Sequence, residues 1–355
     1  MPVSRKRTED DVVELTDRDA PQGAPGGRGR DADRPREVPW SGWKDVGLRV
    51  KDKLKTDKVP LLSAGVAFFI LLALFPALAA VVSVYGLVAD PDQVSQQVTD
   101  LTSALPSSAQ DLITEQLESI VDGASSGIGW ALALSVLGAL WAASSGVKHL
   151  IEAINAAYDE AEDRGFLKLR GLAILLTLGA VVFGVIAIGV LTVLPAVVDE
   201  TGLGSAAQTA VQVASYVGLA IAFVVGLAVL YRYAPDRDKP RWQWVSPGAV
   251  IGSVVWIIAS LGFSFYASNF GSYGETYGSI GAVIVLMLWF VLTAFSVILG
   301  AEINSELEAQ TAKDSTVGEP EPIGARGAVK ADNLGESVDA DEVERANAQP
   351  ETARR

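Results

Sequence analysis

The stretch YGSIGAVIVLMLWFVLTAFSVILGA, residues 277–301, contains no charged residue. The hydrocarbon core of a bilayer is about 30 Å thick, and a helix of roughly 20 apolar residues crosses it at 1.5 Å per residue. One such stretch could also be a buried helix of a soluble protein. It predicts a membrane-spanning helix if the rest of the chain repeats the pattern.

The pattern is repeated five times upstream. The six stretches free of Lys, Arg, Asp and Glu cover residues 60–89, 128–147, 171–198, 206–231, 245–268 and 277–301. A helix satisfies its own backbone hydrogen bonds in lipid, so consecutive apolar stretches of this length are typical of polytopic membrane proteins. The sequence therefore predicts an all-α membrane protein with six transmembrane helices in a domain over residues 60–304.

The basic residues alternate between successive loops. They occur in residues 40–59, 148–170 and 232–244, whereas the loops 90–127, 199–205 and 269–276 contain no Lys or Arg. Basic loops remain on the cytoplasmic side because they resist translocation. We therefore expect a multi-pass protein of the inner or plasma membrane with both termini in the cytoplasm.

The composition restricts the chemistry that the chain can perform. The formal net charge is −14, from 28 basic and 42 acidic residues, and there is one His and no Cys. The chain therefore lacks disulfides, thiol nucleophiles, Cys-based zinc sites and any metal centre that needs two His. The acidic balance also argues against a nucleic-acid partner. We predict neither a cofactor nor a metal site.

The segments outside the apolar stretches fall into three kinds. Residues 1–39 and 305–355 are rich in charge and lack an apolar period, which predicts a disordered N-terminal tail and a disordered acidic C-terminal tail. Residues 40–59 are predicted to form an amphipathic interfacial helix, or alternatively a helix packed on the cytoplasmic loops. Residues 90–127 predict an external helical hairpin that serves as a lid, a partner surface or a simple cap.

The apolar stripe of the predicted amphipathic helix consists of Trp43, Gly47, Val50 and Leu54. Lys44, Lys51, Lys55 and Lys58 lie off that stripe and suit the headgroup layer of an anionic leaflet.

Five sequence blocks together resemble the YihY/BrkB membrane-protein family, which was historically labelled ribonuclease BN. The blocks are LSAGVAFFILLALFPAL (62–78), LGALWAASSGVKHLIEAINAAYDEAEDRGF (137–166), LYRYAPD (230–236), the W-x-W-x-x-PG pattern (242–248) and YGSIGAVIVLMLWF…LGAEIN (277–304). The resemblance covers residues 40 to about 308 and neither tail. It implies a six-helix inner-membrane protein with both ends inside, and a part in envelope resistance or virulence in some members. It implies no defined molecular activity.

The ribonuclease label can be tested against the side chains present. Hydrolysis of a phosphodiester by a protein generally needs metals held by carboxylates and His, or a general acid–base pair. The single His149 supplies no His-based ligand pair. We therefore predict no enzymatic activity and no catalytic residue, and keep a ribonuclease as a minor alternative.

A polar cluster is predicted at the cytoplasmic mouth of the bundle, where polar residues follow the second, fourth and sixth apolar stretches. Its candidate members are Asn155, Tyr158, Arg170, Arg232, Glu302 and Asn304. The alternative is that these side chains bond helix ends and anchor loops.

A second group of small, hydroxyl and aromatic residues lies in or beside the apolar stretches. These candidates for helix contact or for lining a path are Trp141, Ser144, Ser145, Gly248, Gly252, Tyr266, Tyr277 and Trp289. Hydroxyl groups at such depths commonly bond a neighbouring helix or their own helix backbone. Small residues allow helices to approach closely.

The leading hypothesis for function is non-enzymatic transport or handling of a lipid-like or amphipathic envelope component. It rests on uncharged helix interiors, which argue against a proton relay or an ion pump. The alternative is a membrane scaffold for envelope integrity. The expected partners are membrane lipids and envelope proteins, and the sequence leaves the oligomeric state open.

Overall fold

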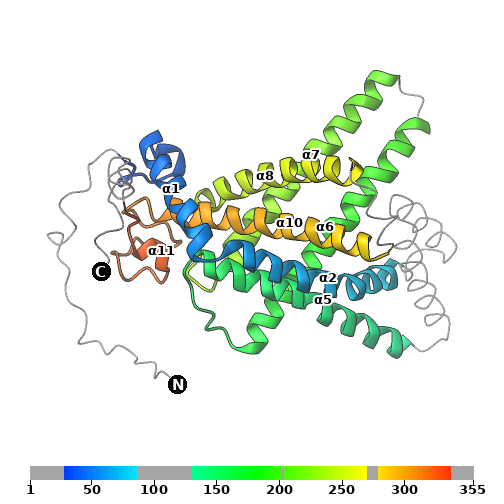
Figure 1. Cartoon of the computed structure of the whole chain (residues 1–355), viewed down its shortest axis with the longest axis horizontal. Coiled ribbons are helices and arrows are strands. Elements are labelled where there is room, and N and C mark those ends of the chain that lie inside the picture. The colour runs from blue at the N-terminus through cyan, green and yellow to red at the C-terminus, as the bar shows by residue number, and fades with distance from the viewer. Residues whose placement is uncertain (1–27, 86–128, 201–203, 270–278, 337–355) are drawn as a thin grey trace, which may run out of the picture.

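The computed structural model describes residues 28–85, 129–200, 204–269 and 279–336, and within these ranges it is helical without a strand (Figure 1). The short elements are the 3-10 helix η2 (Pro35–Glu37), α1 (Trp40–Thr56) and α11 (Val329–Asp332). The long helices are α2 (Val59–Tyr85), α5 (Gly129–Ala157), α6 (Phe166–Glu200), α7 (Ser205–Tyr233), α8 (Trp242–Asn269) and α10 (Ser279–Glu308).

Each long helix overlaps one of the six apolar stretches. Four described helices, α6, α7, α8 and α10, are long and apolar enough to cross a membrane, and a fifth span results if the bent pair α1 and α2 is counted as one. The all-α membrane class is therefore confirmed. The predicted external hairpin over residues 90–127 lies outside the described residues.

Helix α10 occupies the centre of the bundle and packs against α8, α2, α5 and α1. The core cluster includes Ile151, Ile154, Ile298 and Ala301, all fully buried. These residues lie in the last turns of α5 and α10, so the tightest packing is in the half of the bundle nearer α1.

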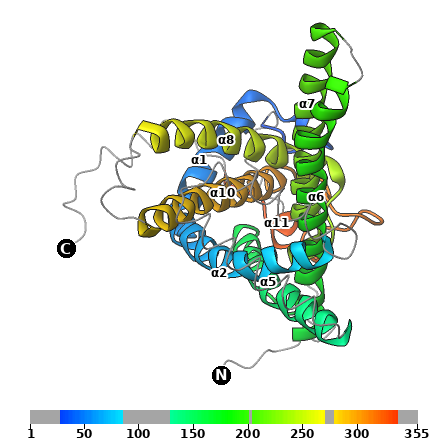
Figure 2. The ribbon, with the colours of Figure 1, turned by 90° about the vertical axis from the view of Figure 1, so that its right-hand side faces the viewer.

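Helices α6 and α7 form a hairpin whose far end stands apart from the other helices (Figures 1 and 2). The most apolar windows of α6 and α7 are only 6% and 11% buried inside the protein, against 33% for α10. Most of this hairpin therefore has apolar surface that no described part of the protein covers.

Helices α1 and α2 meet at a bend of 62°. Lys58 lies between them in the left-handed region, with φ of 53°. Pro60 follows in the first turn of α2, where its missing N–H costs no helical hydrogen bond. The bend sets α1 across the end of the bundle.

The predicted stripe of α1 is wrong at one position and its apolar face has a protein partner. Val46 and Val50 are buried with Leu307 and Trp244, and Trp43 packs against this cluster. Gly47 is exposed instead. The apolar face of α1 contains the neighbouring residue Val46 in place of Gly47, because this face packs against apolar residues of α10 and α8.

The structure also differs from the predicted C-terminal tail. Helix α10 continues to Glu308, and residues 309–336 fold back onto the same end of the bundle as α1 (Figure 1). Buried Arg326 donates to the carbonyls of Ala312, Glu321 and Ala331. Polar side chains that bond backbone groups hold this segment, and such contacts leave no apolar period in the sequence. Residues 337–355 lie outside the described residues.

The N-terminal segment also contacts this end of the bundle. Residues 28–39 are described, and the Arg30 carbonyl accepts a hydrogen bond of 2.8 Å from the Ala312 N–H. Arg28 pairs with the buried Asp45 of α1 at 2.6 Å. The predicted tail over residues 1–39 is therefore ordered in its last part, and residues 1–27 lie outside the described residues.

Candidate functional site at the charged end of the bundle

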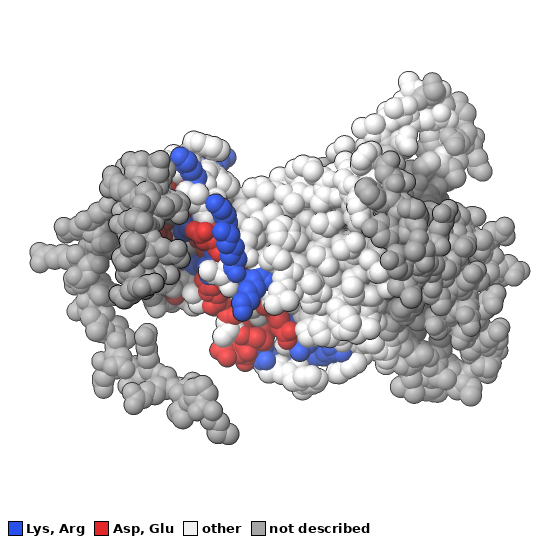
Figure 3. Space-filling view, in the orientation of Figure 1, with Lys and Arg blue, Asp and Glu red and all other residues white. Residues whose placement is uncertain are grey.

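Most charged groups of the described chain gather at one end of the molecule, which we call the charged end. It comprises residues 28–58, 155–170, 232–244 and 302–336. Figure 3 shows the visible Lys, Arg, Asp and Glu side chains on this end and an uncharged surface over the helices. This separation follows from the uncharged apolar stretches.

The side-chain amide of Asn155 connects two loops. Its Nδ2 donates to Glu162 at 2.8 Å, and its Oδ1 accepts from the backbone N–H of Asp236 at 2.8 Å. Arg164 bonds Glu162 at 2.7 Å and donates to the Ala234 carbonyl at 2.7 Å. Burial raises the pKa of Glu162, but Arg164 and Asn155 outweigh it and hold that pKa below its ordinary value. Asn155 therefore anchors the loop after α5 to the loop after α7.

A fully buried ion pair lies beside Tyr158. Arg237 binds both carboxylate oxygens of Glu308 at 2.6 Å, and the two side chains are 0% and 2% exposed. The guanidinium lies 5.2 Å from the centre of the Tyr158 ring. Burial raises the pKa of the Tyr158 phenol above its ordinary value, although Arg237 opposes this. Tyr158 is therefore a packing partner of the pair and remains a neutral phenol.

Six residues of alternating charge form a continuous series of contacts that we call the ion chain. In order these are Arg49, Glu306, Lys330, Asp159, Lys53 and Asp57, with N···O distances of 2.7, 2.6, 2.8, 2.6 and 3.4 Å. Burial raises the pKa of Asp159, but Lys330 and Lys53 outweigh it and lower that pKa below its ordinary value. The ion chain ties α1, α10 and α11 to the loop after α5.

Glu302 lies one helical turn before Glu306 on α10. The residue is 0% exposed. Both carboxylate oxygens are buried, and neither forms a hydrogen bond with a described residue. Its nearest charged neighbours include Asp57, Lys330 and Lys53. Glu302 is therefore a buried neighbour of the ion chain that forms no ion pair with its described members.

Asn304 joins α10 to the start of α8. Its Nδ2 donates to the Val245 carbonyl at 3.0 Å, and its Oδ1 accepts from the Gly248 N–H at 2.7 Å. Pro247 between them has no N–H and disturbs the helical hydrogen bonds of α8. The Asn304 amide therefore satisfies backbone groups around the proline.

The crossing of α8 and α10 depends on glycines. A Cβ at Gly248 would lie 2.0 Å from the Gly300 carbonyl oxygen, and one at Gly300 would lie 2.7 Å from the Gly248 carbonyl oxygen. A Cβ at Gly252 would lie 3.1 Å from the Ser296 carbonyl oxygen. Tyr231 of α7 donates to the Val297 carbonyl at 2.8 Å beside this crossing. The backbones of α8 and α10 are therefore in direct contact at this crossing, and α7 reaches it through the Tyr231 hydroxyl.

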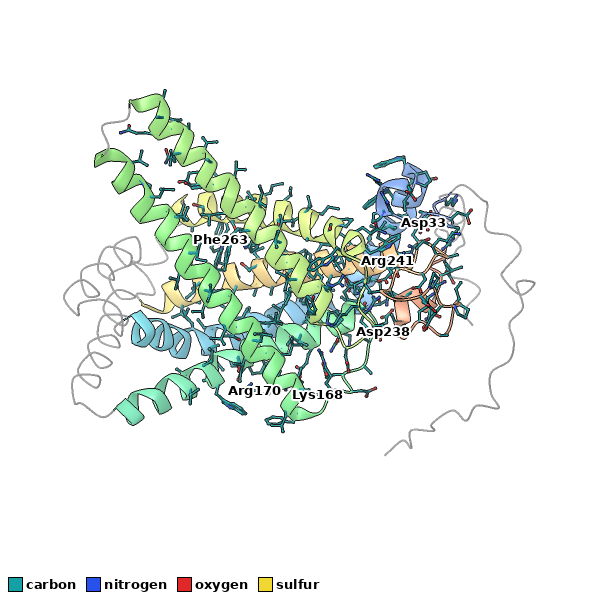
Figure 4. All side chains as sticks on the ribbon, turned by 180° about the vertical axis from the view of Figure 1, so that it is seen from behind. Asp33, Lys168, Arg170, Asp238, Arg241 and Phe263 are labelled. Carbon is teal, nitrogen blue, oxygen red and sulfur yellow. The ribbon has the colours of Figure 1, made fainter. Side chains whose placement is uncertain are left out.

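The two predicted arginines lie away from Glu302 and Asn304. Arg170 donates to the Trp141 carbonyl and to Ser145 at 3.3 Å on α5, and its guanidinium lies 4.1 Å from the Trp141 ring. Arg232 donates to the Pro240 carbonyl and lies 4.6 Å from the Trp242 ring. Figure 4 labels Arg170 near Lys168 at the start of α6, and Asp238 and Arg241 beside the C-terminal segment.

The remaining candidates lie along the helices. Ser144 donates to the Trp141 carbonyl of its own helix at 2.8 Å. The Trp289 ring lies 6.3 Å from that of Trp256 on α8. Tyr266 is 40% exposed, and the centre of its ring lies 6.2 Å from that of Phe263. Tyr277 lies outside the described residues.

The predicted polar cluster is thus divided among several hydrogen-bond networks. Asn155 bonds the loops, Asn304 bonds α8, and Arg170 and Arg232 bond other elements. Within the six, Asn304 and Glu302 are neighbours of Tyr158 that influence its phenol electrostatically. The hydrogen bonds of Asn155, Asn304, Arg170 and Arg232 are those of helix ends and loop anchors.

Sequence reasoning missed the partners that organise the charged end. The sequence pattern does not identify Lys330, Gly300 or Glu308, the partner of Arg237. The spacing of Glu302 and Glu306 by four residues places two acids on one helix face, which was an available signal. The bases that face these acids come from α1 and from the predicted C-terminal tail. The local sequence around Glu302 and Glu306 therefore does not indicate which bases lie opposite them.

These features define the class: an all-α integral membrane protein whose apolar helices close on a folded, ion-paired end. The chain belongs to the family described as "Virulence factor BrkB", whose model matches residues 50–323. This confirms the resemblance stated from the sequence blocks. The match extends beyond residue 308 into the folded C-terminal segment.

Several proteins of known sequence resemble the chain. A "putative ribonuclease-like protein YfkH" of Bacillus subtilis (strain 168) is 36% identical over 253 residues, which are 69% of this chain and 88% of that protein. A "UPF0761 membrane protein" of Tolumonas auensis is 33% identical over 82 residues, 23% of this chain and 27% of that protein. One of Xanthomonas campestris pv. campestris (strain B100) is 35% identical over 91 residues, 26% and 21% of the two chains. No solved structure matches.

Proposed function

We propose that the chain is a six-span inner-membrane protein, with both termini cytoplasmic, that moves or handles a lipid-like or amphipathic envelope component without catalysis. The observation that carries the proposal is the unequal burial along the bundle. The half near the charged end has a packed core, whereas the helices of the far half, which we call the open half, have apolar side chains that no described residue covers.

The open half is apolar on several helices. On α7, Val213, Val217 and Ile221 are 52% to 60% exposed. On α8, Leu261 and Phe265 are 67% and 72% exposed. Exposed apolar surface on these helices is suited to acyl chains, because their contact with it costs no hydrogen bond.

A row of aromatic rings crosses the helices between the two halves. Phe223 of α7 lies 6.3 Å from Phe183 of α6 and 4.8 Å from Trp256 of α8, and Trp256 lies 6.3 Å from Trp289 of α10. Trp256 also donates to Thr293 at 3.0 Å. The row of aromatic rings separates the open half from the packed half. Its Trp256–Thr293 pair provides a polar group for a lipid headgroup.

The acids of the charged end support a function without catalysis. Glu162, Glu306 and Glu308 are each held by an Arg or Lys. No group of three or more His, Asp or Glu side chains within the described ranges is arranged to hold a metal ion. A ribonuclease, as the old family label says, would need acids free to act on the phosphodiester.

The test is exchange of labelled phospholipids and other amphiphiles between vesicles or leaflets, with the full chain reconstituted in proteoliposomes. We expect faster exchange than in protein-free vesicles, a several-fold change for Trp256→Ala, and the wild-type rate for Trp40→Ala. Trp40 is 82% exposed at the charged end and serves as the matched control. An unchanged rate over a broad panel would contradict the proposal and favour the scaffold alternative.

The scaffold alternative has one supporting observation. The charged end is a folded surface built from both flanking segments, with Val317 and Ile323 exposed. Under this alternative, an envelope protein binds that surface and lipid exchange is absent.

A further inference from the structure

The ion chain is balanced in charge without Glu302. Arg49, Lys53 and Lys330 face Asp57, Asp159 and Glu306, which makes three bases against three acids. Glu302 is therefore a single excess carboxyl group. An ionised Glu302 would leave this assembly with an uncompensated negative charge.

The described residues around Glu302 do not offer the carboxylate a hydrogen-bond donor. The residue is 0% exposed, and both oxygens lack a hydrogen-bond partner among the described residues. The charged groups that face it are Asp57 and Lys53 of α1, Lys330 of α11 and Glu306 of α10, and Tyr158 follows α5 nearby. A carboxylate is far more costly to bury in this state than a neutral carboxylic acid.

A proton neutralises Glu302 without additional ligands. A metal ion would need several oxygen ligands, and the described residues offer no group of three suitable side chains. Both neighbouring lysines are already bound to Asp159. The proton is thus the ligand that the existing side chains accommodate.

We infer that Glu302 is a reversible proton-binding site that controls how tightly α1 and α11 are held at the charged end. With the proton bound, Lys53 and Lys330 remain on Asp159. When the carboxylic acid releases its proton to water, the new carboxylate attracts these lysines and weakens their hold on Asp159. The inference is independent of which molecule the membrane domain handles.

Infrared difference spectroscopy of the full chain in lipid nanodiscs tests the protonation state. We expect a carbonyl band of a protonated carboxylic acid at neutral pH in the wild-type protein, absent in Glu302→Gln. Glu319→Gln removes an exposed acid of the same end and should retain the band. Absence of the band from the wild-type protein would overturn the inference.

Hydrogen exchange at alkaline pH tests the coupling. After correction for the intrinsic rate, exchange in α1 and α11 should rise with pH in the wild-type protein and in Glu319→Gln. It should stay nearly constant in Glu302→Gln, which resembles the protonated side chain. If Glu302→Gln and the wild-type protein share one pH profile, Glu302 does not control the charged end.

Discussion

At the scale of single residues, glycine positions decide how closely α8 and α10 pack. Gly248 and Gly300 each lie against the other's carbonyl oxygen, whereas Gly262, farther along α8, has open space where a Cβ would be. The same residue type therefore has different roles on one helix. Only the close pair, Gly248 and Gly300, brings α10 near enough to α8 for Asn304 to bond the backbone around Pro247.

Gly248→Ala should lower the stability of the full chain in detergent by about 1–3 kcal/mol, the usual cost of forcing extra volume into a packed contact. The added Cβ would lie 2.0 Å from backbone, which cannot move as a flexible side chain can. Thermal unfolding followed by tryptophan fluorescence measures the effect. Gly262→Ala is the control on the same helix and should match the wild-type protein or exceed it slightly. Equal melting of both variants would refute the role of this crossing.

Arg237→Met should destabilise the protein by about 3–5 kcal/mol, because it leaves Glu308 buried without its cation. The double variant Arg237→Met/Glu308→Leu should recover part of this loss in the same melting assay. The partly exposed pair of Lys148 and Glu152 offers a comparison. Lys148→Met should cost less than about 1 kcal/mol. A small effect of Arg237→Met alone would show that the pair contributes little.

At the scale of elements, the ion chain holds α1 and α11 against the loop after α5. Because Lys330 and Lys53 lower the pKa of Asp159 below its ordinary value of 3.8, its contribution to stability is present above that value. The contribution is lost as the pH falls through the lowered pKa in the folded state, below about pH 4.

Asp159→Asn should therefore flatten the loss of stability on acidification, measured as the melting temperature of the charged end between neutral and acid pH. Asp159 has φ of 57°, and Asn tolerates this left-handed conformation. Asp52→Asn changes an exposed residue of α1 and should retain the acid dependence of the wild-type protein. An unaltered profile for Asp159→Asn would exclude this carboxyl group as the source.

The C-terminal segment offers a second test at this scale. Arg326→Ala removes hydrogen bonds to several carbonyls and should raise hydrogen exchange and proteolysis within residues 309–336. The apolar helices should keep their protection, since their packing does not involve Arg326. Lys313→Ala alters an exposed side chain of the same segment and should leave both readouts unchanged. Protection of the segment in Arg326→Ala would disprove its anchoring role.

At the scale of the whole molecule, the separation of charged end and apolar helices predicts the orientation in the membrane. The chain contains no Cys, so single cysteines can be introduced without further changes. In spheroplasts, Gly204→Cys at the far end of the α6–α7 hairpin should react with a membrane-impermeant maleimide. Lys313→Cys should react only after permeabilisation. The reverse pattern would contradict cytoplasmic termini.

Much of the fold could be predicted from the sequence, because the uncharged stretches are long enough for the membrane to impose a helix on each. The candidate site could not be predicted to the same extent. Asn155 and Asn304 were singled out, but their partners Asp236, Glu162 and Val245 are distant in sequence or are backbone groups. The stripe of α1 was displaced by one residue, because its partner surface on α10 is not visible in a local pattern.

The sequence by itself determined the all-α membrane class and the family, since both depend on local composition and on ordered sequence blocks. Only the tertiary structure decided that residues 305–336 fold, that Arg237 pairs with Glu308, and that Glu302 is buried without a hydrogen-bond partner among the described residues. The physical reason is range. Hydrophobicity acts along each helix and is visible in consecutive residues, whereas ion pairs and buried polar contacts depend on which distant segments the fold brings together.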